Sequence, residues 1–336
     1  MKKVSLLAGF LVVGIFGIFS FVIDSHEYTQ KKEEVKEVAV VPLLFTGDIM
    51  LGRYVETLKN TTGLDPFGDT AEFLKSHTTI VNLEGPIPSV HEPTPISGFT
   101  FSFASSTPKY LKDHGVRAVS LANNHSMDHG RSGYEATKQS LDLEGISHFG
   151  GYGTTEPDYF ETKLGTTTVI VYGINMISST WNERAAHAAT KLLRQNHPGA
   201  YLAAFIHWGN EYDLKQGVVQ QVFAHKLIDE GVNAIIGSHP HVTQGIEIYK
   251  NSPIFYSLGN FIFDQYFSND TQRGYTVSID KKDSHLVFQL IPVTSVRSKT
   301  MIVDSLLSQT ILDGIAKSSQ TNLQEEIRKG VFTLKF

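Results

Sequence analysis

Short apolar runs alternate with amphipathic segments along the chain from residue 41 to about residue 240. The apolar runs have the length of buried strands, and the amphipathic segments have the 3.6-residue period of helices. We expect strands at 41–46, 78–83, 116–121, 167–172, 201–206 and 232–236. We expect helices at 67–75, 132–144 and 215–230. Strands that alternate with helices in this way predict a layered α/β domain.

The pattern changes after residue 244, where apolar segments follow one another too closely for helices between them. The segments read GIEIYK, PIFYSLG, GYTVSID and HLVFQLIPVTSV. They predict either a second, antiparallel sheet or a mixed extension of the first. Residues 303–329 again have a helical pattern, which predicts either a terminal cap or a subunit contact.

A run of 20 residues without a charged side chain, residues 4–23, follows Lys2 and Lys3. As a helix it would be about 30 Å long, which matches the hydrocarbon core of a bilayer. A cleaved signal peptide is the alternative, but its apolar region is usually about 7–15 residues and ends in an A-x-A-like site. The segment FSFVIDSHEY lacks such a site. We therefore expect an uncleaved anchor, with the amino terminus in the cytoplasm because of the two lysines.

These patterns divide the chain into four segments. They are a cytoplasmic tip and transmembrane anchor (1–23), a polar stalk (24–41), the main domain (42–300) and a helical carboxy-terminal extension (301–336). With 336 residues and a hydrophobic content of 41%, the chain is able to bury a full core. We expect a single-pass protein of the cell membrane whose main domain is extracellular.

The chain contains no cysteine and carries a formal net charge of -5. The missing thiols exclude disulfides, thiolate metal sites and a lipid-modified cysteine as the means of membrane attachment. An acidic surface repels nucleic acid and other polyanions unless a local cation reverses its sign. We therefore expect no nucleic acid among the partners.

Potential metal ligands stand at the ends of five of the predicted strands. In layered α/β domains the carboxyl ends of strands share one edge, so these side chains would gather in one crevice. Taken singly, each has another explanation: the acids and the asparagine suit turns or caps, and a histidine suits a hydrogen-bonded loop or core position. Their shared position favours a metal site. The set is Asp48, Glu84, Asn124, His125, His207, His239 and His241.

The ligand types narrow the metal and the chemistry. Carboxylates, an amide oxygen and imidazoles without thiolates suit manganese, iron, zinc or nickel better than calcium. A carboxylate that bridges two ions about 3.5–4 Å apart belongs to the arrangement that activates water against a phosphoryl centre. His125, beside Asn124, is then placed to protonate a leaving oxygen or to hold the transferring group. We assign Asn123 a structural role.

Six motifs, taken in order, carry a resemblance to a known family. They are FTGDIMLGR, VNLEGPI, SLANNHSMDHG, FIHWGNEY, IIGSHPHVTQG and YSLGNFIFDQ. They resemble the bacterial CapA (PgsA) family of poly-γ-glutamate capsule proteins and, through it, the calcineurin-like metallophosphatase superfamily. The similarity covers roughly residues 43–265. It implies that residues 42–300 form a four-layer αββα sandwich, with two mixed sheets between helices.

The resemblance also implies a role for each ligand. Asp48 matches the first-motif aspartate of the superfamily, and Glu84 matches the acid that bridges two metal positions. The remaining matches are Asn124 and His125 for the asparagine–histidine pair, and His207, His239 and His241 for the later histidine ligands. Met50 departs from the pattern, because the superfamily has a histidine there and a thioether is a poor ligand for an oxygen-rich site. The first metal position, left with Asp48, Glu84 and His241, would be weak or empty, so we expect one or two divalent ions.

Other residues near these motifs are candidates for supporting roles. Arg53 is a candidate to bind a phosphate or carboxylate, with a surface ion pair as the alternative. Asp128 is placed to orient His125 or His129, and we count it with Arg53 and His125 as catalytic. The candidates that contact substrate are Glu211, Tyr212 and Asn260.

The resemblance implies work at the membrane beside the polymer synthase, in the synthesis or export of poly-γ-glutamate. The implied partners are membrane-bound synthase components and an anionic polymer or phosphoester substrate, and the implied cofactor is manganese, iron or zinc. An acidic domain needs such ions as a local positive site for a polyanion. Two alternatives stay open: a metal-dependent hydrolase of a phosphoester or amide, and a metal-free scaffold that kept the fold.

Overall fold

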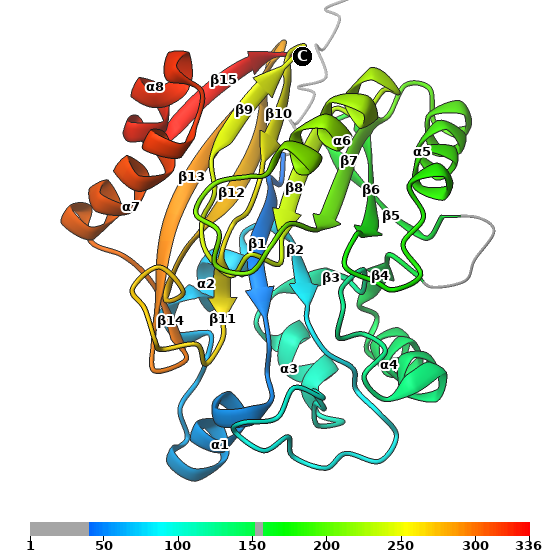
Figure 1. Cartoon of the computed structure of the whole chain (residues 1–336), viewed down its shortest axis with the longest axis vertical. Coiled ribbons are helices and arrows are strands. Elements are labelled where there is room, and N and C mark those ends of the chain that lie inside the picture. The colour runs from blue at the N-terminus through cyan, green and yellow to red at the C-terminus, as the bar shows by residue number, and fades with distance from the viewer. Residues whose placement is uncertain (1–39, 152–156) are drawn as a thin grey trace, which may run out of the picture. The chain divides into compact units, whose positions relative to one another are not determined.

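The computed structural model describes residues 40–151 and 157–336, which form two β-sheets with helices outside them (Figure 1). The first sheet contains β1 (Leu43–Ile49), β2 (Thr78–Leu83), β3 (Val116–Ser120), β4 (Ser147–Phe149), β11 (Asn260–Ile262), β12 (Arg273–Lys282), β13 (His285–Val296), β14 (Lys299–Ile302) and β15 (Val331–Lys335). The second contains β5 (Tyr159–Leu164), β6 (Thr167–Asn175), β7 (Tyr201–His207), β8 (Ala234–Ser238), β9 (Ile246–Tyr249) and β10 (Ser252–Phe255). The α-helices are α1 (Arg53–Thr62), α2 (Ala71–Lys75), α3 (Thr107–Asp113), α4 (Gly130–Glu144), α5 (Glu183–Asn196), α6 (Val218–Asp229), α7 (Ser305–Ser318) and α8 (Gln324–Lys329).

Both sheets mix parallel and antiparallel strands. The first runs in the order β14–β13–β12–β1–β2–β3–β4, with β11 paired to β1 and β15 paired to β13. In it β1 to β4 are parallel, whereas β12 pairs antiparallel with β1 and β13. The second runs β5–β6–β7–β8–β10–β9, with β6, β7, β8 and β10 parallel and antiparallel strands at both edges. The predicted α/β class is confirmed.

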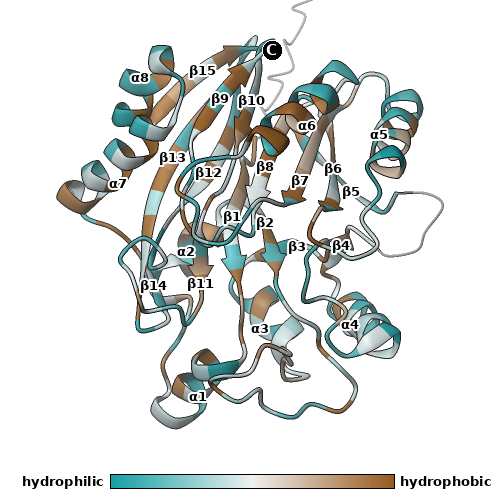
Figure 2. Cartoon of the chain, in the orientation of Figure 1, coloured by the Kyte–Doolittle hydropathy of each residue, from teal (hydrophilic) through white to brown (hydrophobic). Residues whose placement is uncertain are grey.

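Alternate side chains of the central strands face different cores, which produces four layers. Leu43 and Phe45 of β1 pack between the two sheets with Phe205 of β7. Leu44 faces the other side, where its cluster includes residues of α1 to α4. A third cluster joins the second sheet to α5 and α6. Burial on both faces explains why these strands are apolar runs. Figure 2 shows hydrophobic colours on β7 and β9, whereas α5 and α8 are largely hydrophilic.

Most elements correspond to the predicted segments. The six strands expected before residue 240 correspond to β1, β2, β3, β6, β7 and β8, and the expected helices correspond to α2, α4 and α6. After residue 244, β9 and β10 join the second sheet, whereas β12 and β13 extend the first. Of the two possibilities that the sequence left open, the mixed extension is therefore correct.

The carboxy-terminal segment completes the central core. Ile311 and Ile315 of α7 and Ile327 of α8 pack in the cluster between the sheets. Both helices lie beside the antiparallel half of the first sheet, α7 against β13 and α8 against β15 (Figure 1). This packing favours the terminal cap over the subunit contact. The last strand, β15, has no counterpart among the predicted elements and pairs with β13.

The predicted anchor (1–23) lies outside the described residues, as does nearly all of the predicted stalk (24–41). Among the helices of residues 40–151 and 157–336, none combines the length and the apolar character that a membrane span requires. The anchor and the extracellular position of the main domain therefore stay predictions.

Candidate metal centre

The carboxyl ends of strands from both sheets bring the predicted ligands together. Asp48 is the penultimate residue of β1, and Glu84 directly follows β2. His207 is the last residue of β7, and His239 directly follows β8. The backbone N–H of His239 donates to Asp48 Oδ2 (3.2 Å), which links the two sheets at this point. All four side chains are buried, so the common edge predicted from the sequence exists.

Two glycines allow the segment after β10 to pass close to these strand ends. A Cβ atom at Gly47 would lie 1.9 Å from the carbonyl oxygen of Gly259. A Cβ atom at Gly237 would lie 2.0 Å from the carbonyl oxygen of Tyr256. The absence of a side chain at both positions lets one backbone segment contact β1 and β8 next to the ligands.

The candidate ligands form two groups of three. The strand group consists of Asp48, Glu84 and His207, and the loop group consists of Glu211, His239 and His241. Within each group, one ligand atom per residue lies within 4.8 Å of the others. The groups adjoin, because His241 Nδ1 is 3.3 Å from Asp48 Oδ2 and His241 Nε2 is 3.7 Å from Glu84 Oε1. These distances also allow the grouping that the resemblance implies, in which His241 joins Asp48 and Glu84.

The donors present fit a divalent ion. Glu84 Oε1 and His239 Nδ1 are buried and have no hydrogen-bond partner. A buried polar group without a partner costs on the order of 1–3 kcal/mol, and a charged one costs more. A cation held among the two groups would give both atoms a partner. Carboxylate oxygens and imidazole nitrogens together suit manganese, iron or zinc, although they do not specify which.

Burial sets the protonation of the site. Burial and the Asp48 charge raise the pKa of Glu84 well above its ordinary value. Burial, with the nearby imidazoles of His239 and His241, lowers the pKa of His207 well below its ordinary value, and burial lowers the pKa of His239 to about 4. Both are therefore neutral at pH 7, the form that binds metal. Burial acts to lower the pKa of His241 too, but the charges of Glu84 and Asp48 raise it to about 9.

Asn82, which the sequence analysis overlooked, holds the two carboxylates of the strand group. Its Nδ2 donates to Asp48 Oδ1 (2.8 Å) and to Glu84 Oε2 (3.3 Å). Asn123 in turn donates to Asn82 Oδ1 (3.0 Å) and to the backbone oxygen of Leu83 (2.8 Å). Its position in the sequence gave a signal, since Asn82 precedes Glu84 by two residues and therefore shares a strand face with it.

His207 is fixed through both ring nitrogens. Its Nε2 lies 2.8 Å from Asn124 Oδ1, and its Nδ1 lies 2.9 Å from Ser238 Oγ. Asn124 therefore lies beside the strand group, as predicted. Ser238, the last residue of β8, carried no distinct sequence signal, because a serine at a strand end is common in turns.

His125 and Asp128 form a pair next to the ligands. His125 Nδ1 lies 2.8 Å from Asp128 Oδ2, which also accepts a hydrogen bond from the backbone N–H of Phe101 (2.6 Å). The imidazole stacks on the Phe101 ring with a centroid distance of 4.0 Å. Because Asp128 holds Nδ1, the ring orientation is fixed and Nε2 is the nitrogen suited to proton transfer. The predicted contact between Asp128 and His125 is present.

A family model described as bacterial capsule synthesis protein PGA_cap matches residues 42–265. The chain belongs to this family. PGA biosynthesis protein CapA of Bacillus subtilis (strain 168) is 30% identical over 324 residues, which cover 88% of this chain and 82% of that protein. Capsule biosynthesis protein CapA of Bacillus anthracis is 26% identical over 285 residues, which cover 75% of this chain and 68% of that protein.

A more distant relative is a probable polyglutamine synthesis accessory protein of Mycobacterium tuberculosis (strain ATCC 25618 / H37Rv). It is 24% identical over 321 residues, which cover 76% of this chain and 84% of that protein. The family prediction made from the six motifs is confirmed. The matched range, residues 42–265, contains both ligand groups and ends at Gln265, whereas β12 to β15 and the two last helices lie beyond it.

Met50 lies just before α1 and Arg53 is its first residue, and the side chains of both make contacts within the protein. Met50 is fully buried in the cluster under the helices, and its Sδ accepts from the backbone N–H of Gly52 (3.1 Å). Arg53 forms an ion pair with Asp264, and its guanidinium lies 4.9 Å from the centre of the Phe101 ring. The ion-pair alternative for Arg53 is therefore present, with a buried partner, and anion binding by Arg53 stays a prediction.

The three predicted substrate contacts lie at different depths. Asn260 is buried; its Oδ1 lies 3.0 Å from His241 Nδ1, and its Nδ2 donates to Gln265 Oε1 (3.0 Å). This places Asn260 behind the histidine as a support. Tyr212 is 42% exposed, and Glu211 is exposed and belongs to the loop group. Contact of any of them with substrate stays a prediction.

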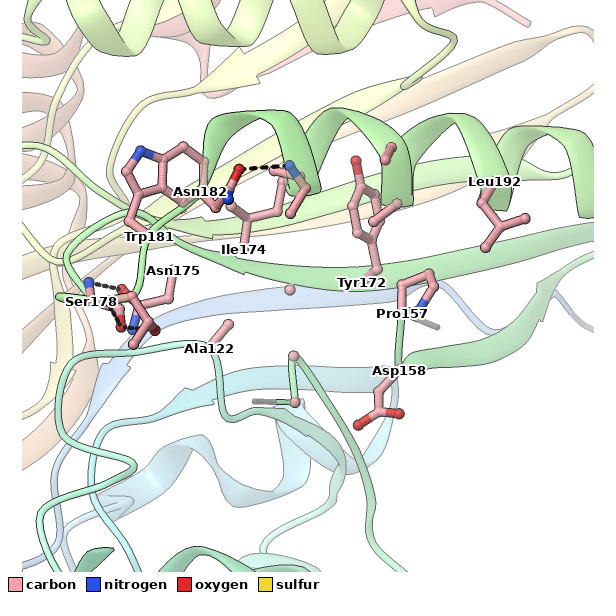
Figure 3. Close-up of a pocket in the computed structure, with 18 residues that line it drawn as sticks. Ala122, Pro157, Asp158, Tyr172, Ile174, Asn175, Ser178, Trp181, Asn182 and Leu192 are labelled. Carbon is pink, nitrogen blue, oxygen red and sulfur yellow. Dashed lines mark hydrogen bonds between the residues drawn. The ribbon is translucent and has the colours of Figure 1, made fainter. Parts of the chain in front are cut away.

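Two cavities border the site. One of about 510 Å³ has Tyr212 in its wall beside the loop group, and its other lining residues are Arg53, Tyr54, Ile96, Phe99, Asp264, Gln265, Tyr266 and Phe267. The other, of about 500 Å³, lies between β6 and α5 (Figure 3). Tyr172 and Trp181 line it, and so does Ala122, which precedes Asn123 and Asn124 in the chain. Each cavity therefore has room for a ligand of substantial size.

Proposed function

We propose that this chain takes part in the synthesis or export of poly-γ-glutamate through a divalent metal centre on a metallophosphatase-like fold. The family and the names of the Bacillus relatives support the polymer. Two mixed sheets between layers of helices, with ligands at the strand ends, support the fold. The observation that carries the metal centre is the burial of Asp48, Glu84 and His207 within one group of ligand atoms.

We place the main domain outside the cell, anchored by residues 1–23 beside the membrane-bound polymer synthase. The uncharged run at 4–23 and the two lysines before it support this orientation. Intact cells treated with an external protease test it, because an extracellular domain is cut whereas a cytoplasmic marker protein is not. Protection of the domain in cells whose surface proteins are digested would contradict the orientation.

The residues around the centre have separate roles in binding an anionic polymer. A bound divalent ion supplies Lewis acidity and positive charge. That charge matters here because the chain itself has a formal net charge of -5, which repels a polyglutamate. Asn82 keeps Asp48 and Glu84 fixed as ligands, and Asn260 does the same for His241. The cavity beside Tyr212 has aromatic walls that would exclude water from one side of a bound chain.

Complementation tests the polymer role. In a poly-γ-glutamate producer that lacks its own CapA-type protein, the wild-type chain should restore capsule, whereas His207→Ala should not. His285→Ala is the matched control, because His285 is exposed on β13 in the antiparallel half of the first sheet. Immunoblots of the membrane fraction confirm equal amounts. Full capsule with His207→Ala would remove the metal centre from the proposal.

The second candidate function is a metal-dependent hydrolase of a phosphoester or amide, and the His125–Asp128 pair favours it. In such a reaction water adds to the phosphorus or carbonyl carbon, the bond to the leaving group breaks, and a proton from His125 Nε2 goes to the leaving atom. A purely structural or transporting centre has no use for an oriented proton donor beside its ligands.

Turnover by the purified full chain separates the two functions. With added manganese, a generic phosphodiester should be cleaved by a hydrolase, and His125→Gln should lower kcat about 100-fold or more. His285→Ala again serves as the control. If manganese binds but no turnover is measured, and His207→Ala still abolishes capsule, the assembly role stands without hydrolysis. If no metal binds at all, the metal-free scaffold remains.

A further inference from the structure

The connection between β2 and α3, residues 84–106, is long and contains no helix or strand (Figure 1). Its ends come together, because the backbone N–H of Phe103 donates to the carbonyl oxygen of Pro86 (2.9 Å). Residues 86–103 therefore form a closed loop, which we call the β2–α3 loop. Loops longer than about 12–15 residues without helix or strand are uncommon in compact domains and are usually functional when ordered.

Contacts with the rest of the protein fix the base of the β2–α3 loop. His91 Nε2 lies 2.8 Å from Glu56 Oε1 of α1, and His91 Nδ1 lies 2.8 Å from Ser102 Oγ within the loop. Phe101, also in the loop, is buried and stacks on His125 next to the ligands. These contacts hold the loop beside the metal centre.

The outer part of the β2–α3 loop carries large apolar side chains that are exposed to water. Ile96 is 62% exposed and Phe99 is 76% exposed, and both line the cavity of about 510 Å³. Phe267, which is 67% exposed, and Tyr212 line the same cavity from two other loops. Their rings meet edge to face, with a centroid distance of 5.1 Å. A group of exposed apolar side chains around a cavity is typical of a surface that binds a ligand or partner.

The cavity adjoins the metal centre but has no net charge of its own. Tyr212 lies beside His241 of the loop group, with a distance of 6.2 Å between the ring centroids. Among the described residues that line the cavity, only Arg53 and Asp264 are charged, and they form an ion pair with each other. The apolar walls therefore suit an uncharged part of a ligand, whereas an anionic part is better placed at the cation of the centre.

We propose that Ile96, Phe99 and Phe267 bind the uncharged backbone of a γ-linked polyglutamate and thereby select it over an α-linked one. This inference rests on the proposed function and names the residues that recognise the polymer. A γ-linked chain has its methylene groups in the backbone, which is able to lie among apolar side chains while a carboxylate reaches the cation. An α-linked chain has its methylene groups in side chains that end in a carboxylate, so the same walls would take a charge out of water.

Binding of short oligomers tests this assignment. The full chain, solubilised in detergent with Mn²⁺ present, is titrated with a γ-linked or an α-linked glutamate oligomer of equal length, and calorimetry gives both dissociation constants. We expect the wild type to bind the γ-linked oligomer about 10-fold more tightly than the α-linked one. Phe99→Ala and Phe267→Ala should each weaken binding of the γ-linked oligomer about 10-fold and remove most of the preference.

Two further variants separate contact with the ligand from a structural role. Val90→Ala is the matched control, because Val90 is an exposed residue of the same loop and is not among the residues that line the cavity. It should change neither dissociation constant. Phe99→Leu keeps an apolar side chain and should keep the preference for the γ-linked oligomer. Circular dichroism confirms the fold of each variant, which is expected to persist because Phe99 and Phe267 are exposed.

The outcomes separate this inference from the proposed function. If the wild type binds neither oligomer, the polymer is overturned as a ligand and this inference with it. If the γ-linked oligomer binds, but both alanine variants bind it as the wild type does, only the role of the apolar residues is overturned. If those variants also lose capsule, or if they change the oligomeric state, the exposed side chains contact a protein partner or a second copy, which likewise overturns this inference.

Discussion

The strand group and the loop group hold the same kinds of ligand by different means. Asp48 and His207 lie within β1 and β7, and Glu84 follows β2, so ordinary strand geometry places all three. His239 and His241 have left-handed backbone conformations after β8, and Glu211 comes from an exposed loop. The first group is placed by the sheets, and the second depends on contacts between loops.

This difference indicates that the strand group is the more rigid part of the site and the loop group the more adaptable part. Asp48 and Glu84 are positioned by strands and by the shared amide of Asn82, so their placement does not depend on contacts between loops. Ligands held by strained loops adapt more readily, and movement of loops is how many sites admit a substrate. A centre built from both kinds combines a fixed side with an adjustable one.

The largest expected effect on stability comes from Asn82→Ala, which removes a hydrogen-bond donor from the strand group only. Both buried carboxylates lose a donor, so we expect the free energy of unfolding of the metal-free protein to fall by about 3 kcal/mol. Urea denaturation at pH 7 measures it. Asn210→Ala removes an exposed loop amide and should change stability by less than about 0.5 kcal/mol. Equal stability of the two variants would show that Asn82 does not support the carboxylates.

Gly47→Ala should have a smaller effect, because it displaces the backbone at Gly259 but removes no side-chain donor from the two carboxylates. The added methyl group would meet the carbonyl oxygen of Gly259 at 1.9 Å, and we expect a loss of about 2 kcal/mol. Manganese affinity of the strand group should fall with it. Gly199→Ala is the control, since nothing lies within 4 Å of a Cβ atom there. A Gly47→Ala protein with wild-type stability and affinity would contradict the tight approach.

The smallest expected effect is a change of the unfolding free energy with pH, which comes from His239 of the loop group. Burial lowers the pKa of His239 from 6.5 to about 4, so in the metal-free protein the unfolded chain takes up this proton first as the pH falls. The resulting stability is fully present above pH 6.5 and is lost towards pH 4, by about 1 kcal/mol between pH 6.5 and 5.5. The difference in unfolding free energy between the wild type and His239→Gln measures it. A difference that does not change with pH would show that His239 titrates normally.

Local patterns predicted the ligands at the strand ends because strand and ligand are adjacent in sequence. An apolar run followed by Asp48, Glu84 or His207 identifies both the element and the donor it presents. Asn82 was missed because an amide inside an apolar run is ambiguous: only the structure shows that it donates to two carboxylates. The antiparallel strands after residue 244 were recognised, but their division between two sheets depends on long-range pairing such as Leu43 with Ile279.

The loop group was harder to predict for a physical reason. The sequence placed His239 and His241 beside each other, yet the position of Glu211 depends on the hydrogen bond between Tyr212 and Pro240. Such a contact between two loops leaves no periodicity in the sequence. β15 was missed for a related reason: only one of its five residues, Phe332, is buried, so its pattern is weak.

The pairing of β15 with β13 has a consequence for how the molecule is made. The core between the sheets includes Phe332 from β15 and Leu43 from β1, so it stays incomplete until almost the whole chain has been synthesised. Contacts so distant in sequence close slowly. Folding of this core is therefore expected to be completed only after the final strand is available to pair with β13.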